Sequence, residues 1–233
     1  MSDKVALITG CSKRIGKEIA LFLSNEGYKI IIHYNSNDGT ENKLKKSLTT
    51  DSKKIKFDLN KVEKIENFTK NCISKFGKID LLINNASVFK KDNLKESEIK
   101  KTLNINLIAP YLLSLYIGNH MKKKGSGKII NLTDSVASTE PWRGFSSYSI
   151  SKSGLEMVTK SLSKELGRKV QVNSIAPGPI LKPSDKRIKV YRNSFKEENA
   201  LKSIISALKI FLNTKKISGK SISVDNCESI ISD

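Results

Sequence analysis

An α/β fold with a doubly wound, parallel, seven-stranded sheet and helices on both faces is the fold class that the sequence predicts. Short runs rich in β-branched residues alternate with longer helical patterns along the 233 residues, and this alternation indicates βαβ units. The runs at residues 30–32 and 81–83 are apolar throughout, which is typical of strands buried on both faces. Right-handed crossovers between such strands place helices on both faces of the sheet.

The predicted elements follow one another in a regular order. The strands are predicted over residues 5–9, 29–34, 55–58, 79–84, 128–133, 170–175 and 221–224. The helices between them are predicted over residues 14–25, 41–48, 62–76, 97–122, 149–166 and 197–212. Because no linker, internal repeat or low-complexity tail interrupts this order, residues 1–233 are interpreted as a single domain, with a variable loop at residues 180–198.

The composition limits the classes of partner that the chain could bind. The formal net charge is +19, which on its own suggests a polyanion such as nucleic acid. The positive charge is almost entirely lysine and is spread along the chain, so no nucleic-acid partner is expected. Residues 182–196 are the one local concentration of Lys and Arg, and they indicate a solvated loop or a segment that attracts an anionic substrate.

Local features disfavour several other classes. The first residues lead directly into a strand-like run and do not resemble a signal peptide. The longest apolar stretch, residues 107–121, is too short and too polar to span a bilayer. The three cysteines are far apart and lack CxxC spacing, which fits reduced thiols in the cytoplasm. With only two histidines, His33 and His120, no metal site is expected.

The turn after the first predicted strand is typical of a phosphate site. The strand ends at Gly10, and the following residues enter a helix at Arg14. Free N–H groups and the helix dipole at such an N-terminus point at a bound anion. Gly10 would allow the turn and Gly16 close helix packing. Dinucleotide-binding loops usually have a further glycine where this chain has Arg14, so an ordinary strand-to-helix turn is the alternative.

The end of the second predicted strand bears on the choice of cofactor. Enzymes that prefer NAD usually place an acid there for the ribose 2′-hydroxyl. Residues 33–37 contain no acid, and the first one is Asp38. Neutral donors near Lys13 and Arg14 favour a 2′-phosphate, so the predicted cofactor is NADPH or NADP. Asp58, at the end of the third strand, either binds the adenine amino group or forms a plain turn.

Tyr148 and Lys152 are four residues apart on a predicted helix, so the phenol and the ammonium share one face. A phenol titrates near pH ~10 and is a poor acid–base group at neutrality, but a nearby cation favours the phenolate and lowers that pKa. The pair suits proton transfer to or from an alcohol or imine while a cofactor carries the hydride. On its own, the spacing also fits a surface lysine beside a half-buried tyrosine.

Six motifs in a fixed order resemble the short-chain dehydrogenase/reductase family over residues 5–225. They are Thr9-Gly10-x-x-x-Arg14-Ile15-Gly16, Asn84-Asn85-Ala86-Ser87, Asn104-Ile105-Asn106-Leu107, Ser135, Tyr148-x-x-x-Lys152 and residues 173–179. The resemblance implies a Rossmann-fold reductase of a small molecule, in which residues 180–198 form the substrate loop. With the turn and the second-strand segment described above, the resemblance implies that these residues bind the cofactor: Gly10, Ser12, Lys13, Arg14, Ile15, Gly16, His33, Tyr34, Asn35, Ser36, Asp58, Leu59, Asn85, Ala86, Ser87, Tyr148, Lys152, Pro177, Gly178 and Ile180.

The same resemblance implies catalytic roles. Tyr148 is the expected acid–base, and Lys152 is expected to lower its pKa and to hold the nicotinamide ribose. Ser135 is expected to bind the substrate oxygen. Asn106 is expected to hold a water that links Lys152 to a proton relay, although it could instead only cap or kink its helix.

Three departures from the common pattern are similar to the pteridine reductases and the bacterial dihydropteridine reductases. Arg14 replaces the middle glycine of the turn, Ser87 replaces the glycine after Ala86, and Asp134 directly precedes Ser135. That subgroup carries an Asp at the catalytic serine site, so either Asp134 or Ser135 takes the catalytic place here. Ser87 and Phe89 are then the expected substrate contacts, with Phe89 either stacked on a flat pterin or part of the core.

The expected function is NADPH-dependent reduction of a pteridine-like C=N bond, with Tyr148 as the acid–base. The first alternative is a carbonyl reductase of the 3-oxoacyl thioester type that uses Ser135, Tyr148 and Lys152. The second comes from another class of protein, a cofactor-binding or nucleic-acid-binding protein without activity.

The resemblance also implies a homo-oligomer, a tetramer in preference to a dimer. In that interpretation the apolar side chains of the fourth predicted helix face symmetry mates, namely Leu112, Leu113, Leu115 and Ile117. A helix buried within one chain would show the same pattern.

Overall fold

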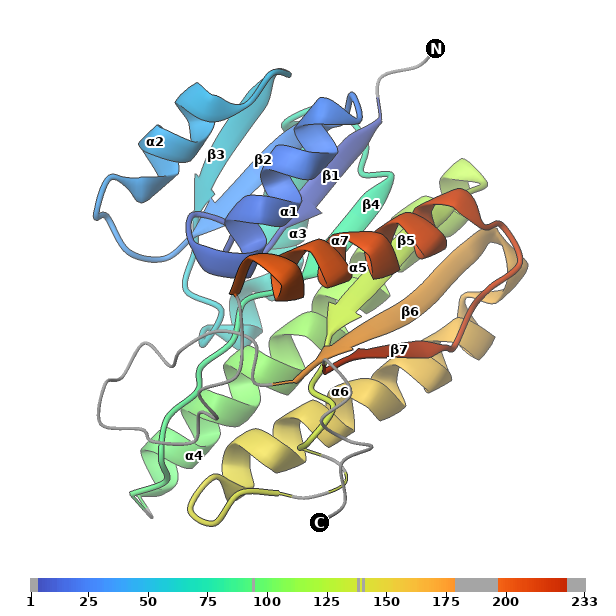
Figure 1. Ribbon diagram of the computed structural model, residues 1–233. Coiled ribbons are helices and arrows are strands. Elements are labelled where there is room, and N and C mark those ends of the chain that lie inside the picture. Colours follow the sequence, from blue (N-terminus) through green and yellow to red (C-terminus); the bar gives the residue numbers. More distant parts are fainter. Residues whose placement is uncertain (1–3, 94, 138, 140, 179–196, 226–233) are drawn as a thin grey trace.

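The computed structural model describes residues 4–93, 95–137, 139, 141–178 and 197–225, and it describes residues 197–200 without their side chains. Within these residues, seven parallel strands form one sheet in the order β3-β2-β1-β4-β5-β6-β7 (Figure 1). The strands are β1 (Val5–Ile8), β2 (Lys29–Tyr34), β3 (Ser52–Lys56), β4 (Leu81–Asn84), β5 (Gly127–Leu132), β6 (Val170–Pro177) and β7 (Ser221–Val224).

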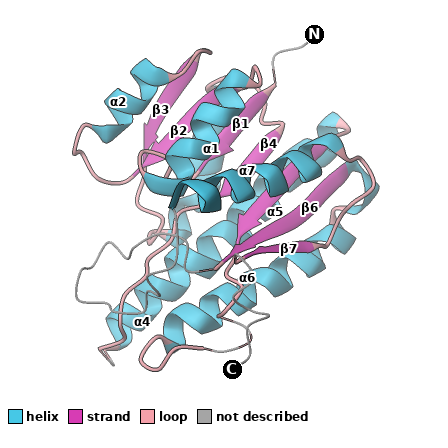
Figure 2. Cartoon of the chain, in the orientation of Figure 1, coloured by secondary structure: helices cyan, strands magenta, loops and turns pink. Residues whose placement is uncertain are grey.

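Helices connect the strands and cover both faces of the sheet (Figure 2). The α-helices are α1 (Arg14–Asn25), α2 (Thr40–Ser47), α3 (Ile65–Ser74), α4 (Glu96–Leu103), α5 (Ala109–Lys124), α6 (Ser146–Glu165) and α7 (Glu197–Asn213). A π-helical segment, Asn104–Ile108, joins α4 to α5, and 3₁₀ turns at Val62–Lys64 and Gly167–Lys169 precede α3 and β6. The predicted fold class, a doubly wound parallel sheet with helices on both faces, is confirmed.

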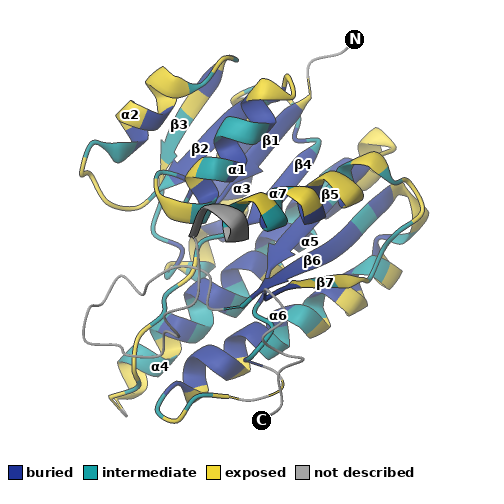
Figure 3. Ribbon diagram, viewed as in Figure 1, coloured by how far each residue is buried: buried dark blue, intermediate teal, exposed yellow. Residues whose placement is uncertain are grey.

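Each face of the sheet carries its own apolar core, because successive side chains of a strand point to opposite faces. Ala6 and Ile8 of β1 pack toward α1, α2 and α7, where Phe211 is fully buried. Val5 and Leu7 pack toward α3, α5 and α6. The inner strands β1, β2, β4, β5 and β6 are therefore almost fully buried, while the edge strands β3 and β7 and the outer faces of the helices are partly exposed (Figure 3).

The strand order places a crevice at one end of the sheet. From β1 the chain winds through β2 and β3 in one direction, and then from β4 to β7 in the other. Ligands of open α/β sheets bind at the carboxyl ends of the strands where the winding reverses. That point lies here between β1 and β4.

The predicted elements differ from the structure mainly where one tertiary contact decides a boundary. The third strand lies at Ser52–Lys56 rather than at 55–58, since this edge strand is half exposed and its apolar periodicity is weak. The helix predicted over 97–122 is interrupted by the π-helical segment. The helix predicted from residue 149 begins at Ser146.

The prediction that four apolar residues of α5 face symmetry mates is wrong for Leu113 and Ile117. Both are fully buried in the core of this one chain. Leu112 and Leu115 are partly buried against the same core. The large apolar side chain that α5 does leave exposed is Tyr111.

The described residues contain no helix that is long and apolar enough to cross a membrane. They also contain no group of three His, Cys, Asp or Glu side chains that could hold a metal ion. Cys11 and Cys72 are buried free thiols, and burial raises the pKa of each to about 12. Cys227 lies outside the described residues.

Candidate active site

A cavity of about 440 Å³ follows the carboxyl ends of the strands on both sides of the crevice. Its walls contain these predicted site residues: Gly10, Lys13, Arg14, Ile15, Gly16, His33, Asn35, Asp58, Leu59, Asn85, Ala86, Ser87, Phe89, Asp134, Tyr148, Lys152, Pro177 and Gly178. The predicted residues Ser12, Tyr34, Ser36, Asn106 and Ser135 do not line it, and Ile180 and most of the predicted loop 180–198 lie outside the described residues.

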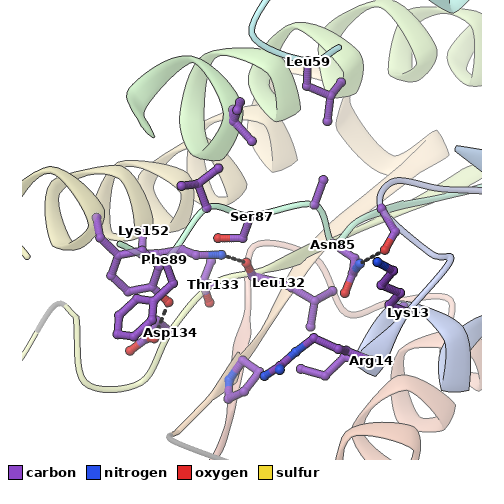
Figure 4. A pocket seen from close by; sticks show the side chains of 18 of the residues that line it. Lys13, Arg14, Leu59, Asn85, Ser87, Phe89, Leu132, Thr133, Asp134 and Lys152 are labelled. Atoms are coloured by element: carbon purple, nitrogen blue, oxygen red, sulfur yellow. Dashed lines mark hydrogen bonds between the residues drawn. The ribbon is translucent and has the colours of Figure 1, made fainter. Parts of the chain in front are cut away.

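The cavity has two ends of different character (Figure 4). Lys13, Arg14 and Asn85 lie at one end, around the turn between β1 and α1. Asp134 and Lys152 lie at the other end, beside the ring of Phe89. The predicted phosphate turn and the predicted Tyr148–Lys152 pair therefore line one cavity.

The turn at the first end has the shape of a phosphate cradle. Gly10 has φ +62°, and a Cβ there would lie 3.0 Å from Ala86 Cα. A Cβ on Gly16 would lie 2.5 Å from Asn85 Nδ2, so both glycines are needed for close packing. Helix α1 begins without a side-chain cap and without an acid in its first turn. Its N-terminal N–H groups can therefore meet an anion.

Arg14 adopts a left-handed conformation in this turn. Its φ is +54°, and it is the one residue other than glycine with positive φ in the described part of the chain. This is the position where dinucleotide-binding loops usually have a glycine. A side chain in this region costs about 1–2 kcal/mol, and such strain is concentrated at functional sites.

Buried polar bonds brace the cradle from behind. His33 Nδ1 accepts a hydrogen bond from Gly10 N–H at 3.0 Å, and its Nε2 donates to Phe57 O at 3.0 Å. Burial lowers the pKa of His33 to about 4, so the ring is neutral and keeps its acceptor. Asn85 Nδ2 donates to the carbonyls of Thr9 and Gly10 at 2.8 and 3.1 Å.

The outer rim of this end is held by an exposed carboxylate. Asp38 forms an ion pair with Lys13 and accepts hydrogen bonds from Ser36 Oγ at 3.0 Å and from Thr40 Oγ1 at 2.5 Å. These bonds, the one from Lys13 foremost, lower the pKa of Asp38. Asp58 lines the cavity and also accepts from the N–H of Asn60 at 3.0 Å, so it forms the predicted turn.

Tyr148 and Lys152 project from α6 into the other end of the cavity. The Tyr148 hydroxyl donates to Asp134 Oδ2 at 2.6 Å. Lys152 Nζ donates to Leu132 O at 2.7 Å and lies 5.8 Å from the centre of the Tyr148 ring. Both side chains are buried in the protein, so the interpretation of Lys152 as a surface residue is excluded.

The pKa of Tyr148 is raised in this structure, whereas a lowered pKa was expected beside Lys152. Burial raises that pKa well above 10, and the carboxylate of Asp134 raises it further. Burial lowers the pKa of Lys152 to about 8, against an opposing effect of Asp134. Tyr148 is therefore a neutral phenol at neutral pH, and its hydroxyl carries a proton.

The two candidate partners of Tyr148 have different surroundings. Asp134 faces the cavity with Oδ2, while its Oδ1 accepts from the N–H groups of Val136 and Ala137 at 2.9 and 2.8 Å. Ser135 does not line the cavity, and its buried Oγ has no hydrogen-bond partner among the described residues. The geometry therefore brings Asp134, rather than Ser135, to Tyr148.

Asn106 lies behind the cavity wall, in the π-helical segment. Its Oδ1 accepts from Val88 N–H at 2.8 Å, and its Nδ2 donates to Val88 O at 2.9 Å and to Ser151 Oγ at 3.2 Å. The side chain is 1% exposed. Its amide therefore fixes the backbone next to Phe89, and the interrupted helix agrees with the alternative that Asn106 kinks it.

An aromatic cluster forms the wall above Asp134. Phe89 stacks on Phe145 with ring centres 4.7 Å apart and an interplanar angle of 15°. It meets Tyr148 and Trp142 edge-on, at 4.7 and 5.5 Å. Trp142 and Thr133 line the cavity and were not predicted. The end of a strand could have indicated Thr133, whereas nothing local distinguishes Trp142 from any loop tryptophan.

The fold and the site together define an oxidoreductase that binds a nucleotide cofactor. The family model described as "short chain dehydrogenase" matches residues 4–191, and the chain belongs to that family. It is 36% identical over 188 residues to the 3-oxoacyl-[acyl-carrier-protein] reductase FabG of Staphylococcus epidermidis, covering 77% of this chain and 76% of that protein. A protein of the same name from Vibrio cholerae is 36% identical over 185 residues.

Solved structures resemble the chain over almost its whole length. FolM alternative dihydrofolate reductase 1 from Brucella canis, complexed with NADP, superposes with a TM-score of 0.85 at 26% identity, covering 100% of this chain and 96% of that one. Acetoin dehydrogenase from Enterobacter cloacae gives a TM-score of 0.86 at 24% identity, covering 98% and 96%. This second likeness shows the fold alone.

Proposed function

We propose that the protein is an NADPH-dependent reductase that acts on the C=N bond of a pteridine-like ring. The observation that carries this proposal is the hydrogen bond from the Tyr148 hydroxyl to Asp134 inside the cavity. An ionised carboxylate only accepts hydrogen bonds, as does a carbonyl oxygen. Asp134 therefore suits a ring that presents N–H donors, and it repels the oxygen of a keto substrate.

The residues at the cradle end fit NADPH. The uncapped N-terminus of α1 and the strained Arg14 suit the diphosphate, and Lys13 at the rim suits a 2′-phosphate once it leaves Asp38. Strand β2 contains no acid that could bind the ribose hydroxyl, and the first acid after it, Asp38, is bound to Lys13 and Thr40. NADPH, when bound, supplies the hydride. The relative from Brucella canis, whose structure contains NADP, supports this choice.

Proton transfer is assigned to Tyr148. The neutral phenol gives its proton to the ring nitrogen as the neighbouring carbon is reduced, so that C=N becomes CH–NH. The phenolate that remains would stand beside Asp134, and the buried ammonium of Lys152 balances its charge. Phe89 and Trp142 offer aromatic surface to a flat ring.

A second candidate is a carbonyl reductase of the 3-oxoacyl thioester type. Its specific support is the 36% identity to the reductases of Staphylococcus epidermidis and Vibrio cholerae. In this function the Ser135 hydroxyl would donate to the keto oxygen, and Tyr148 would give the proton. The Ser135 Oγ has no hydrogen-bond partner in the described part of the chain, which leaves a donor for that role.

The test is turnover of NADPH by the purified protein against a dihydropterin, a dihydrofolate and a 3-oxoacyl thioester. We expect oxidation with the pterin, and a larger rise in melting temperature with NADPH than with NADH. Turnover of the thioester alone would favour the second candidate. Absence of both turnover and a melting shift with all of them would contradict an NADPH-dependent enzyme.

We further propose that the protein acts in the cytoplasm as a homo-oligomer of single-domain chains. Tyr111, Ile150 and Met157 are large apolar side chains that α5 and α6 leave exposed, and burying them between copies would stabilise a dimer or tetramer. Light scattering of the wild type and of Met157→Lys tests this. A monomer at all concentrations for the wild type would contradict it.

A further inference from the structure

Helix α6, which carries Tyr148 and Lys152, lacks a cap of its own. Phe145 occupies the N-cap position without a side-chain hydrogen bond, and the first turn contains no acid. Tyr148 is the third residue of this helix. Because the N-terminal N–H groups of a helix need partners, the position of the catalytic phenol depends on what satisfies that first turn.

Asp92 supplies the missing cap from a distant segment. Its Oδ2 accepts from Ser146 Oγ at 2.7 Å and from Ser147 N–H at 3.1 Å, and its Oδ1 accepts from Ser147 Oγ. The Asp92 N–H donates to Gly144 O at 2.7 Å. Both carboxylate oxygens of Asp92 thus hold the first two residues of α6, and its backbone N–H holds the loop just before the helix.

The segment that carries Asp92 also carries the aromatic wall. Phe89 lies three residues before Asp92 and packs on Phe145 and Tyr148, on either side of the start of α6. At its other end the segment is fixed by Asn106, which binds both backbone groups of Val88. Phe89 is therefore held between two anchors that both contact α6: Asn106 donates to Ser151 Oγ at 3.2 Å, one turn into the helix, whereas Asp92 holds its first two residues.

We propose that Asp92 is a positioning residue that sets the substrate wall and the proton donor as one unit. The inference rests on the proposed reductase function for its kinetic part. Asp92 touches neither the cavity nor the reacting groups, and it acts through Phe89 and Tyr148.

The charge of Asp92 agrees with this role. Burial raises its pKa, but the hydrogen bonds from Ser147 and Ser146 outweigh that effect and leave the pKa lowered. The side chain is therefore an anion at neutral pH. An anion at a helix N-terminus is stabilised by the helix dipole.

Asn93→Ala is a matched control for Asp92→Ala. Asn93 is the next residue, and its Oδ1 accepts from Lys95 N–H at 3.1 Å, at the start of α4 rather than α6. Asn93 lines no part of the cavity. Both variants remove one polar side chain of the same segment, so they separate loss of the α6 cap from general loosening.

The experiment compares kcat, substrate KM and NADPH affinity in the full chain, together with the emission of Trp142, the single tryptophan. For Asp92→Ala we expect kcat to fall between about tenfold and about a hundredfold, substrate KM to rise, and NADPH affinity to stay unchanged. Trp142 emission should shift to the red. Asp92→Asn, which keeps one acceptor oxygen, should give intermediate values, and it replaces Asp92→Ala if that variant does not fold.

Two results would overturn the proposal. One is an equal change in Trp142 emission and kinetics for Asn93→Ala. The other is a loss of NADPH affinity in proportion to kcat, which would mean that the whole site is disturbed. If the wild type turns over no pterin, the proposed function fails on that result alone. The emission shift then still decides whether Asp92 holds the wall to α6.

Discussion

The cofactor end of the cavity is braced by hydrogen bonds to the backbone. The substrate end is held by stacked aromatic rings and by the carboxylates of Asp134 and Asp92. At the first end, His33 and Asn85 bind the backbone of the turn at Gly10. At the second end, Phe89 packs on Phe145, and Asp134 binds the Tyr148 hydroxyl. The hydrogen bonds to the backbone fix the shape of the turn, which has to fit a single cofactor. Side-chain contacts can change with the substrate.

The difference assigns separate tasks to the two ends. Changes at the cofactor end should alter stability and affinity for NADPH while leaving the chemistry intact. Changes at the substrate end should alter kcat and the choice of substrate while leaving cofactor affinity intact. This separation can be broken or sharpened by single substitutions.

The largest expected effect comes from Tyr148→Phe. Loss of the proton donor should reduce kcat by about 10²–10⁴-fold, with little change in NADPH affinity, as followed by cofactor oxidation and by thermal shift. Tyr116→Phe is the control, because Tyr116 is a half-buried phenol of α5 outside the cavity. A parallel loss of cofactor affinity in Tyr148→Phe would show that the two ends are not separate.

A smaller effect is expected when the pH is lowered, because His33 at the cofactor end then becomes protonated. Burial lowers the pKa of His33 from the ordinary 6.5 to about 4, so the unfolded chain binds this proton first as the pH falls. The contribution of neutral His33 to stability is complete above about pH 6.5 and is lost down to about pH 4, by about 3 kcal/mol in all. Denaturant unfolding across this range measures it.

His33→Asn should remove most of that acid dependence, because an amide oxygen can accept from Gly10 N–H without titrating. His120→Asn is the control. His120 is the other histidine of the chain, its pKa is also lowered by burial, and it lies at the far end of α5. If His120→Asn and not His33→Asn flattened the profile, the assignment of the acid transition to the cradle would be wrong.

The smallest effect is expected from Arg14→Gly. Glycine relieves the left-handed strain at φ +54° and should stabilise the free protein by about 1 kcal/mol, while NADPH binding weakens because a cation is lost. Arg14→Ala loses the same cation and keeps the strain. Equal stability of the two variants in urea unfolding would show that the backbone at Arg14 is not strained.

The parallel sheet and the alternation of its strands with helices could be predicted from the sequence, because buried strands and amphipathic helices are encoded in local periodicity. The cradle could be predicted for a similar reason, since Gly10, Arg14 and Gly16 stand at fixed spacing within one turn. The strand β3 was displaced because an edge strand of Ser and Lys carries little apolar signal. Local sequence patterns therefore suffice to predict those elements whose structure is determined by residues close together in the sequence.

The substrate end could be predicted only in part, because residues far apart in sequence make it. Tyr148 and Lys152 were found from their spacing, but the pKa of Tyr148 was expected to be lowered, whereas burial and then the nearby Asp134 raise it. The start of α6 was placed three residues late, because its cap is Asp92, 54 residues away. Spacing alone could not decide between Asp134 and Ser135.

The most direct test of the account compares Asp134→Asn with Ser135→Ala, using kcat/KM for a dihydropterin and for a 3-oxoacyl thioester. Asparagine keeps an acceptor for the turn at Val136 and Ala137 and removes the charge. The account predicts that Asp134→Asn loses about tenfold or more on the pterin, the order expected for an unsatisfied charged hydrogen bond, while Ser135→Ala stays within about twofold. Loss of activity in Ser135→Ala alone, on the thioester, would contradict it.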